Sequence, residues 1–276
     1  MPERMVETRV GRLRVTVIGD GGTTALLWHS LFVDSTTWSP LRPLHRQDRR
    51  LIVIDGPGHG KSGWPAADFA LDDCADAAFE VLDAVGVPES VDWLGNAWGG
   101  HVGLTLAAKS PERLRSVATI ATPVCALSRR QRMTTVPMVW AYRLVGAIPP
   151  LADAVFRAIL GKTFMRSRPD DTARVVKSLR DAPRSGMHRA MRSVMLNRRD
   201  LNPLLSRIAT PTLMIVPTSD PLPPTKQIHT AVTQMPCALA VEVEGDGHVA
   251  PIIAQADELA DIITAFWRDP KGYVAR

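Results

Sequence analysis

One short stretch limits the possible folds of this chain more than any other: Trp93-Leu94-Gly95-Asn96-Ala97-Trp98-Gly99-Gly100-His101. The apolar run at residues 91–94 predicts the end of a buried strand, and residues 102–109 predict a helix. Glycines flank a single position between them, at Gly95, Gly99 and Gly100. Small residues are needed where a strand turns sharply into a helix, because the two backbones approach closely and the turn is strained. The stretch therefore predicts a nucleophile elbow, a strand–turn–helix unit of the pattern G-x-Nu-x-G.

The nucleophile position of this elbow is held by Ala97. Alanine has no nucleophilic atom and no proton that a neighbouring base could remove. The sequence therefore predicts the frame of an active site without its central reagent.

Strand and helix patterns alternate along most of the chain. Residues 6–18 alternate in polarity around Gly11 and predict an antiparallel hairpin. Apolar runs predict buried strands at residues 25–28, 51–54, 91–94, 116–121, 212–216 and 239–243. Helices are predicted after Asp72 and Asp73, at residues 102–109 and at residues 259–266. This alternation predicts an α/β fold with a mostly parallel sheet covered by helices on both faces.

Residues 124–208 differ from the rest of the chain in pattern and in charge. They contain no clear buried-strand run and show helical spacings instead, such as Met187, Met191 and Met195. They carry 17 Lys and Arg against 5 Asp and Glu, a net charge of +12, whereas the remainder carries 16 against 23, a net charge of −7. A basic surface can attract nucleic acid or an anionic membrane. Because no nucleic-acid motif or aromatic platform accompanies these charges, we expect solvated arginines on a helical unit and no nucleic-acid partner.

The order of these motifs resembles that of the α/β-hydrolase family over nearly the whole chain. The resemblance rests on five segments: His29-Ser30-Leu31, Asp55-Gly56-Pro57-Gly58-His59-Gly60-Lys61-Ser62, the elbow, the segment around Asp220, and Gly247-His248. It implies a central, mostly parallel sheet with a helical cap inserted between the sixth and seventh core strands. Residues 124–208 fit this cap, which leaves residues 1–123 and 209–276 for the two parts of the core.

Two residues after the later strands complete the family's catalytic order of nucleophile, acid and base. Asp220 follows the strand predicted at residues 212–216, and His248 follows Gly247 just past the last strand. A histidine suits a general base because its pKa lies near neutrality. A carboxylate beside it holds the imidazole tautomer and stabilises the imidazolium cation. We therefore expect Ala97, Asp220 and His248 to mark the catalytic positions, with a serine expected where Ala97 stands.

The resemblance also implies an oxyanion hole and a substrate pocket. The backbone N–H groups of Leu31 and Trp98 are expected to stabilise a negative charge that develops on the substrate oxygen. His29 and His59 stand beside glycine and serine turns and are expected to brace loops. Further residues are expected to contact the substrate: Ser30, Phe32, Trp140 and Met191.

Two identities of the missing nucleophile are compatible with the flanking residues. Asn96 resembles the Gly-Asn-Ser pattern of esterases and carbon–carbon bond hydrolases, which favours a lost serine. Trp98 resembles the residue that often follows the aspartate nucleophile of haloalkane dehalogenases and epoxide hydrolases. However, Leu31 stands where dehalogenases often have asparagine, and the chain has only Tyr142 and Tyr273, whereas epoxide hydrolases use two cap tyrosines.

These observations favour a hydrolase of a small lipophilic carboxylic ester or lactone, in a form that lacks its nucleophile. Retention of Asp220 and His248 favours this interpretation, because a frame that lost its chemistry long ago need not keep them. Three alternatives stay open. They are a natural non-catalytic protein that binds small molecules, a carbon–carbon bond hydrolase, and a haloalkane dehalogenase with a lost aspartate.

Several other groups and partners are not expected. The isolated cysteines Cys74, Cys125 and Cys237 have no metal-ligand spacing, so the sequence predicts no disulfide framework, metal or cofactor. No apolar run is long enough to span a bilayer, and the first residues show no signal-peptide core, so the cytoplasm is the expected location. A homodimer is left open.

Overall fold

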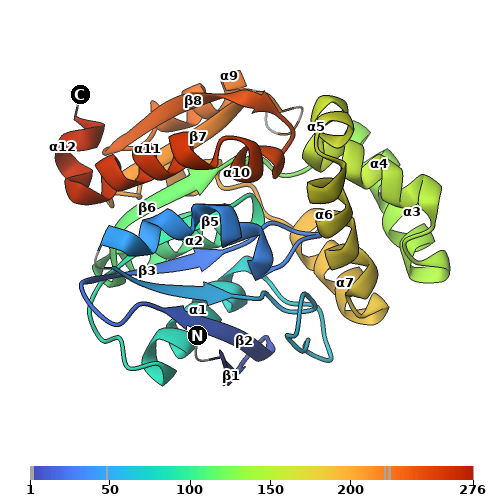
Figure 1. Ribbon diagram of the computed structural model, residues 1–276, viewed down its shortest axis with the longest axis horizontal. Coiled ribbons are helices and arrows are strands. Elements are labelled where there is room, and N and C mark those ends of the chain that lie inside the picture. The colour runs from blue at the N-terminus through green and yellow to red at the C-terminus, as the bar shows by residue number, and fades with distance from the viewer. Residues whose placement is uncertain (1–2, 48, 221, 223–224, 276) are drawn as a thin grey trace.

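The computed structural model describes residues 3–47, 49–220, 222 and 225–275. Within them, eight strands form one sheet in the order β1-β2-β4-β3-β5-β6-β7-β8 (Figure 1). The pairings of β1 with β2 and of β2 with β4 are antiparallel, and all the others are parallel. The strands are β1 (Glu3–Thr8), β2 (Gly11–Ile18), β3 (Thr23–Trp28), β4 (Arg49–Ile54), β5 (Val91–Asn96), β6 (Leu114–Ile120), β7 (Thr212–Ser219) and β8 (Ala238–Asp246).

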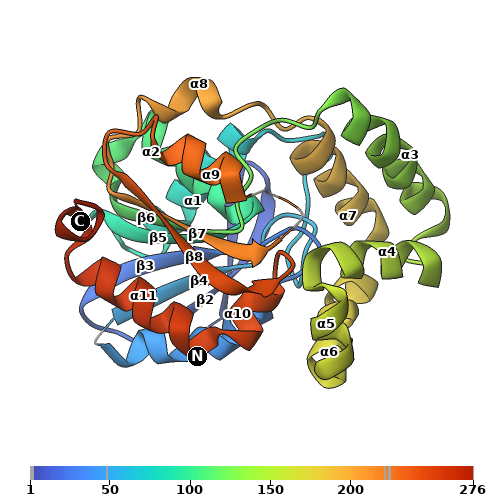
Figure 2. The same cartoon turned by 90° about the horizontal axis from the view of Figure 1, so that it is seen from above.

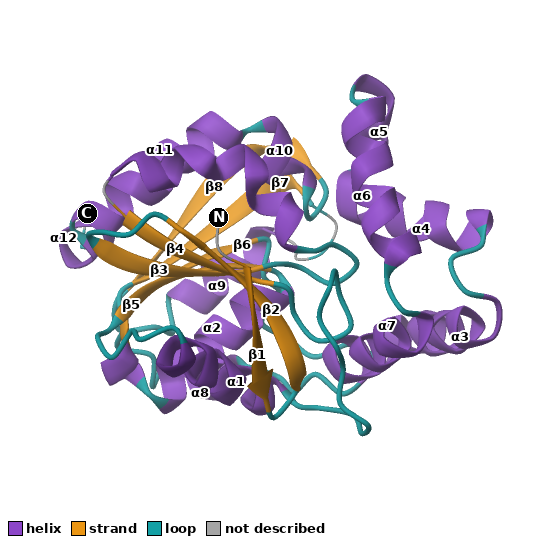
Figure 3. Cartoon of the chain, turned by 60° about the horizontal axis from the view of Figure 1, so that its bottom comes forward, coloured by secondary structure: helices purple, strands orange, loops and turns teal. Residues whose placement is uncertain are grey.

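The inner strands are apolar along most of their length because helices cover both faces of the sheet. Helices α1 (Leu71–Ala84) and α2 (Trp98–Lys109) lie on one face, and η1 (Ser35–Gln47) and α11 (Ala256–Arg268) lie on the other (Figures 2 and 3). Successive side chains of one strand point to opposite faces. Trp28 therefore enters the hydrophobic cluster on the α2 side, whereas Leu27 enters the cluster that contains Phe266 of α11.

The segment between β6 and β7 is helical: none of residues 124–208, all of which are described, lies in a strand. Helices α3 to α7 stand beside the sheet as a separate group (Figure 1). This helical insertion contains α3 (Arg129–Val145), α4 (Pro149–Leu160), α5 (Lys162–Ser167), α6 (Pro169–Asp181), α7 (Arg184–Met191), the π-helical turn η3 (Arg192–Leu196) and α8 (Asn202–Leu205). The shorter elements elsewhere are η2 (Pro111–Arg113), α9 (Thr225–Val232), α10 (Ala250–Ala254) and α12 (Pro270–Val274).

The predicted α/β fold with a mostly parallel sheet is confirmed, and so is the N-terminal hairpin, in which Gly11 pairs with Thr8. The elements differ from prediction mainly at their ends. The helix after the elbow begins at Trp98 rather than at residue 102, because the turn leads into it without a loop. The strand predicted at residues 116–121 begins at Leu114 and ends before Ala121, whose φ of 50° leaves the strand conformation. Among the described helices, none combines the length and the apolar composition that crossing a membrane requires.

Candidate active site

The turn between β5 and α2 has the geometry of a nucleophile elbow. Ala97 takes φ 46° and ψ −96°, a backbone conformation that is uncommon for a residue with a Cβ and that clusters at functional sites. The Ala97 N–H donates to the Ile120 carbonyl over 2.9 Å, and the Ala97 carbonyl accepts from the His101 N–H over 3.0 Å. A Cβ at Gly99 would lie 1.9 Å from the carbonyl oxygen of Trp28. Contact between α2 and the neighbouring strand β3 therefore explains Gly99, while a Cβ at Gly100 would lie 1.9 Å from the Thr122 hydroxyl oxygen.

Asp220 and His248 meet through their side chains, although 28 residues separate them. The His248 Nδ1 and the Asp220 Oδ2 are 2.7 Å apart, and the carboxylate side chain is fully buried. The other carboxylate oxygen, Oδ1, accepts from the Leu222 N–H over 2.8 Å. Because the carboxylate can only accept, Nδ1 carries the hydrogen and Nε2 is left as the basic nitrogen. A base oriented by a buried acid thus stands at the edge of the sheet that holds the elbow.

The backbone of His248 is fixed by groups from two other parts of the chain. The His248 and Val249 N–H groups both donate to the Ile159 carbonyl of α4, each over 2.7 Å. The buried Asn96 Nδ2 donates to the His248 carbonyl and to the Ile120 carbonyl, each over 3.0 Å. The sequence indicated Asn96 only as part of a Gly-Asn-Ser-like pattern. In the structure, its side chain connects the loop of His248 to the elbow.

The N–H groups of Leu31 and Trp98 lie at the wall of one cavity with Ala97. Leu31 precedes Phe32, whose φ of 74° turns the loop after β3 sharply. Within the described part of the chain, neither N–H has a hydrogen-bond acceptor. Two such donors beside the elbow are available to a ligand in the cavity, and an oxyanion hole is built from donors of this kind.

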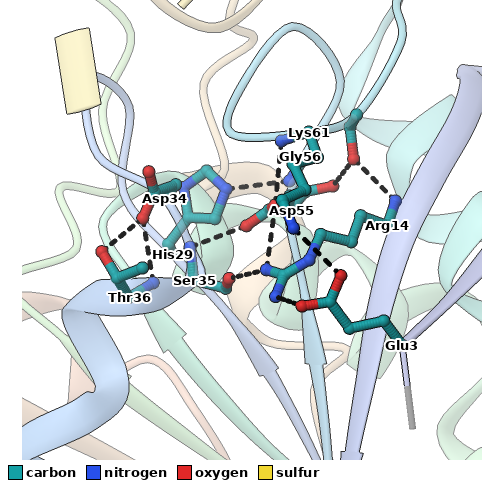
Figure 4. A network of polar contacts seen from close by, with 10 residues as sticks. Glu3, Arg14, His29, Asp34, Ser35, Thr36, Asp55, Gly56 and Lys61 are labelled. Carbon is teal, nitrogen blue, oxygen red and sulfur yellow. Dashed lines mark hydrogen bonds and ion pairs between the residues drawn. The ribbon is translucent and has the colours of Figure 1, made fainter. Parts of the chain in front are cut away.

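His29 and His59 connect the loop after β3 to the loop after β4, as predicted. The His29 Nε2 accepts from the Gly56 N–H over 2.8 Å (Figure 4). The His29 Nδ1 lies 2.6 Å from the Ser30 carbonyl. The His59 Nε2 accepts from the Phe32 N–H over 3.3 Å. Burial lowers the pKa of His29, and burial together with the neighbouring His29 lowers the pKa of His59 to about 3. Both rings are therefore neutral near pH 7. In each ring, one nitrogen can accept a hydrogen bond and the other can donate one.

Asp55 holds the same two loops from the opposite side (Figure 4). Its carboxylate is almost completely buried and accepts from the Ser35 N–H over 2.8 Å and from the Lys61 N–H over 3.1 Å. The guanidinium of Arg14 in β2 reaches both Asp55, over 3.3 Å, and the Ser35 hydroxyl, over 2.8 Å. The segment that begins at Asp55 thus braces the loop of Leu31 and takes no visible part in the cavity wall.

Trp98 is packed inside the core. Its ring lies within 5.5 Å of the Trp28 ring centroid, 5.2 Å of His59 and 6.2 Å of Phe69. A Cβ at Gly56 would lie 2.5 Å from this indole, so the position of Trp98 also explains why residue 56 is a glycine. The identity of residue 98 therefore has a packing reason that is independent of the missing nucleophile.

A cavity of about 160 Å³ lies between the elbow and the helical insertion. Six of the predicted site residues line it: Ser30, Leu31, Phe32, Ala97, Trp98 and His248. Asp220 lies behind His248, outside the lining. The opposite wall comes from the insertion and its two connections, through Cys125, Ala126, Leu127, Gln131, Ala158, Ile159, Val194, Met195 and Arg198.

Neither Trp140 nor Met191 is part of this cavity wall, although both were expected to contact substrate. Trp140 is half exposed and lies 5.4 Å from the His188 ring, with the Arg192 guanidinium 5.9 Å from its own ring. Met191 is buried within the hydrophobic cluster, and Met195, one turn further along the same methionine face, lines the cavity instead. The helical spacing of Met187, Met191 and Met195 indicates one apolar face, but spacing does not tell which turn of that face meets a cavity.

Two further basic residues line the cavity and were not found by sequence reasoning, His101 and Arg198. His101 belongs to α2 and places its Nε2 2.5 Å from the Pro123 carbonyl. Burial, with a contribution from Arg198, holds the pKa of His101 well below its usual value. His101 ends the elbow stretch but holds no position of its G-x-Nu-x-G pattern, and Arg198 stands in no motif, so no local pattern distinguishes them. Among the described residues, no group of three His, Cys, Asp or Glu is arranged to hold a metal ion.

The fold, the elbow and the acid–base pair together define an α/β hydrolase. Residues 25–262 match the profile of the alpha/beta hydrolase family, so the chain belongs to this family, as its motifs implied. The match covers both parts of the sheet and the helical insertion between them.

Proteins similar to this chain include one without a known activity and one esterase. An uncharacterized protein of Mycobacterium tuberculosis is 27% identical over 96% of this chain and 81% of its own length. The pimeloyl-[acyl-carrier protein] methyl ester esterase of Xanthomonas campestris is 28% identical over 92% of this chain and 98% of its own length.

Solved structures confirm the fold over almost the full chain. A thermophilic esterase from Thermogutta terrifontis superposes with a TM-score of 0.88 at 21% identity, over 98% of this chain and 100% of that one. The enol-lactonase from Burkholderia xenovorans superposes with a TM-score of 0.87 at 22% identity, over 97% and 100% of the two chains.

Proposed function

We propose that this is the site of a carboxylic ester or lactone hydrolase whose nucleophile is absent, because Ala97 stands where a serine hydroxyl is needed. The single observation that carries the proposal is the buried Asp220–His248 pair, joined over 2.7 Å, with His248 in the same cavity wall as Ala97. A base oriented in this way has no evident purpose beside an alanine unless it serves a reaction at that position. The ester and lactone activities named for similar proteins support the substrate class.

The remaining groups define what a hydroxyl at position 97 would do. Nε2 of His248 would take the hydroxyl proton while the oxygen attacks the carbonyl carbon of the substrate. The N–H groups of Leu31 and Trp98 would receive the negative charge on the carbonyl oxygen. The imidazolium, stabilised by Asp220, would then protonate the leaving alcohol, and a water activated by the same base would release the acid.

With Ala97 in place, the chain should bind its substrate reversibly and form no covalent intermediate. Removing one oxygen leaves the cavity wall and the N–H donors in position, so ground-state binding is retained while stabilisation of the transition state is lost. Residues 124–208 serve in this proposal as the cap that closes the cavity and excludes water from it.

A lost aspartate, and with it a haloalkane dehalogenase, is the weaker assignment. Its main support was Trp98, which the packing against Trp28 and Phe69 explains without reference to the nucleophile. A carbon–carbon bond hydrolase and a natural non-catalytic binding protein use the same frame and are separated from the ester hydrolase by experiment.

The test is to introduce the hydroxyl. Ala97→Ser is expected to raise the hydrolysis of p-nitrophenyl esters or of lactones by at least ~10⁴-fold over the unsubstituted chain, as is typical when a triad is completed. The double variant Ala97→Ser/His248→Asn should lose this gain, which controls for adventitious hydrolysis.

Other outcomes would redirect the assignment. Activity of Ala97→Asp on haloalkanes would assign the chain to the dehalogenases. A serine variant that stays inert on a broad ester and lactone panel, while both forms bind the same ligand equally tightly, would identify a binding protein and contradict the proposal.

A further inference from the structure

The cavity beside Ala97 contains a positive charge that no described carboxylate of its lining neutralises. Of the described residues that line it, none is Asp or Glu, whereas Arg198 belongs to the lining. Arg198 follows η3, on the connection that leads from the helical insertion back towards β7. Its charge therefore lies on the wall that the insertion supplies, whereas the elbow belongs to the wall that the core supplies.

The contacts of Arg198 leave part of its guanidinium without a partner. One Nη donates to the Cys125 carbonyl over 2.6 Å. The Nε is enclosed by protein and has no hydrogen-bond acceptor among the described residues. The nearby Asp200 carboxylate accepts instead from the Asn202 backbone N–H, over 3.0 Å, and from its side-chain amide, over 2.7 Å. Arg198 forms no ion pair within the described residues. Burial lowers the pKa of Arg198, and the Asp200 carboxylate raises it from beyond ion-pair distance.

The adjacent arginine provides a contrast. Arg199 is exposed and pairs with the Asp72 carboxylate over 3.0 Å, as surface arginines commonly do. Burial lowers the pKa of Arg198 to about 10, so the group is desolvated yet still charged near pH 7. A buried, charged donor without an anionic partner is costly unless a ligand supplies that partner.

We propose that Arg198 binds a carboxylate carried by the substrate, at the end of the molecule that lies away from the reacting carbonyl. The proposal rests on the proposed function for the position of that carbonyl, between Ala97 and the two N–H donors. The substrate class is then a half-ester of a dicarboxylic acid, or a lactone that carries a carboxylate. Arginine suits this role because its planar fork matches a carboxylate and stays charged. The apolar lining between the two ends, including Leu127, Ile159 and Val194, fits the carbon chain that joins them.

The test uses the unsubstituted chain, which should bind without turnover. Calorimetry compares the monomethyl esters of the linear diacids from succinate to suberate with the corresponding dimethyl esters, which have the same chain and no charge. At the chain length that fits, the half-ester is expected to bind at least ~10-fold more tightly than the diester. Arg198→Met should abolish this difference, whereas the matched surface variant Arg199→Met should retain it.

Arg198 also holds the Cys125 carbonyl, so its loss could disturb folding. Circular dichroism and thermal unfolding of each variant check this, and Arg198→Lys keeps the charge in case the methionine variant does not fold. The lysine variant should prefer the half-ester by less than the unsubstituted chain, because it lacks the planar fork. If the unsubstituted chain shows no preference for any half-ester, or if Arg198→Met keeps the preference, the proposal is wrong.

Hydrolysis by Ala97→Ser separates this inference from the proposed function. A serine variant that hydrolyses neutral and acidic esters equally well would contradict the role of Arg198 and leave the hydrolase intact. A chain that binds half-esters through Arg198, but whose serine variant hydrolyses nothing, would keep the anion site and contradict the hydrolase.

Discussion

The two walls of the cavity are held in different ways. On the core side, the loops after β3, β4 and β5 are locked by buried groups with defined partners, such as His29, His59 and Asp55. On the insertion side, Arg198 lines the cavity and forms no ion pair among the described residues. Away from the cavity, five large apolar side chains of α3 and the turn after it are exposed: Met133, Trp140, Leu144, Val145 and Ile148. Under the proposed function, the core wall would fix the geometry of the reaction, and Arg198 of the insertion wall would bind the substrate.

One contact crosses this division. The Ile159 carbonyl of α4 accepts from both His248 and Val249, so the insertion also helps to position the base. Ile159 also lines the cavity, so α4 contacts both the cavity and the backbone of His248. The predictions below test how far the two walls differ.

The largest difference in stability is expected between a glycine substitution in the elbow and one in the helical insertion. Gly99→Ala should prevent folding, because its Cβ would lie 1.9 Å from the backbone oxygen of Trp28, and backbone cannot move aside cheaply. Gly146→Ala at the end of α3 should cost about 1–3 kcal/mol, since φ of 73° is strained for alanine but the nearest atom, Arg184 Nε, is 3.7 Å away. Expression and urea unfolding of both variants measure this. A folded Gly99→Ala protein of near-normal stability would contradict the close-contact account of the elbow.

The acid–base pair is expected to control the rate and to leave binding alone. In the Ala97→Ser background, Asp220→Asn should lower kcat by about 10⁴-fold, because the amide can present its donor to Nδ1 and favour the wrong imidazole tautomer. KM should change little, since Asp220 lies outside the cavity lining. Steady-state kinetics on one ester measures both values. A change confined to KM would place Asp220 in substrate binding.

The buried histidines of the core wall should make the protein sensitive to acid. Because the pKa of His59 is lowered to about 3, the folded chain keeps this ring neutral while the unfolded chain protonates it near pH 6.5. Stability is therefore full above pH 6.5 and is lost as pH falls from there towards 3. From pH 7.5 to pH 5, His59 alone should account for about 2 kcal/mol of this loss. Urea midpoints at both values should differ less in His59→Gln, and an equal pH dependence in both proteins would refute the assignment.

The smallest effect is expected for a surface pair of the insertion. Lys177 and Asp181 form an ion pair one turn apart on α6, with both side chains well exposed. Lys177→Met should change the free energy of unfolding by no more than about 0.5 kcal/mol, because exposed pairs are solvated and screened by salt. Thermal unfolding at low and high salt measures it. A larger loss would mean that the insertion depends on its surface charges more than its exposure suggests.

The sheet, the elbow and the pairing of Asp220 with His248 could be predicted from the amino-acid sequence. These features follow strands, and the carboxyl ends of parallel strands meet at one edge of a sheet, so residues far apart in the chain could be assigned to one place. The bracing role of His29 and His59 was predictable for the same reason, since both follow such strands.

The tertiary structure alone decided which groups of the helical insertion meet the cavity. Helical spacing identified the methionine face, yet Met195 rather than Met191 reaches the cavity, and Trp140 lies half exposed. Arg198 stands beside Arg199 in the sequence, but Arg198 lines the cavity without an ion pair among the described residues, while Arg199 is exposed and pairs with Asp72. Periodicity records which face of a helix is apolar. What that face packs against depends on contacts between elements distant in sequence, and these exist only once the chain has folded.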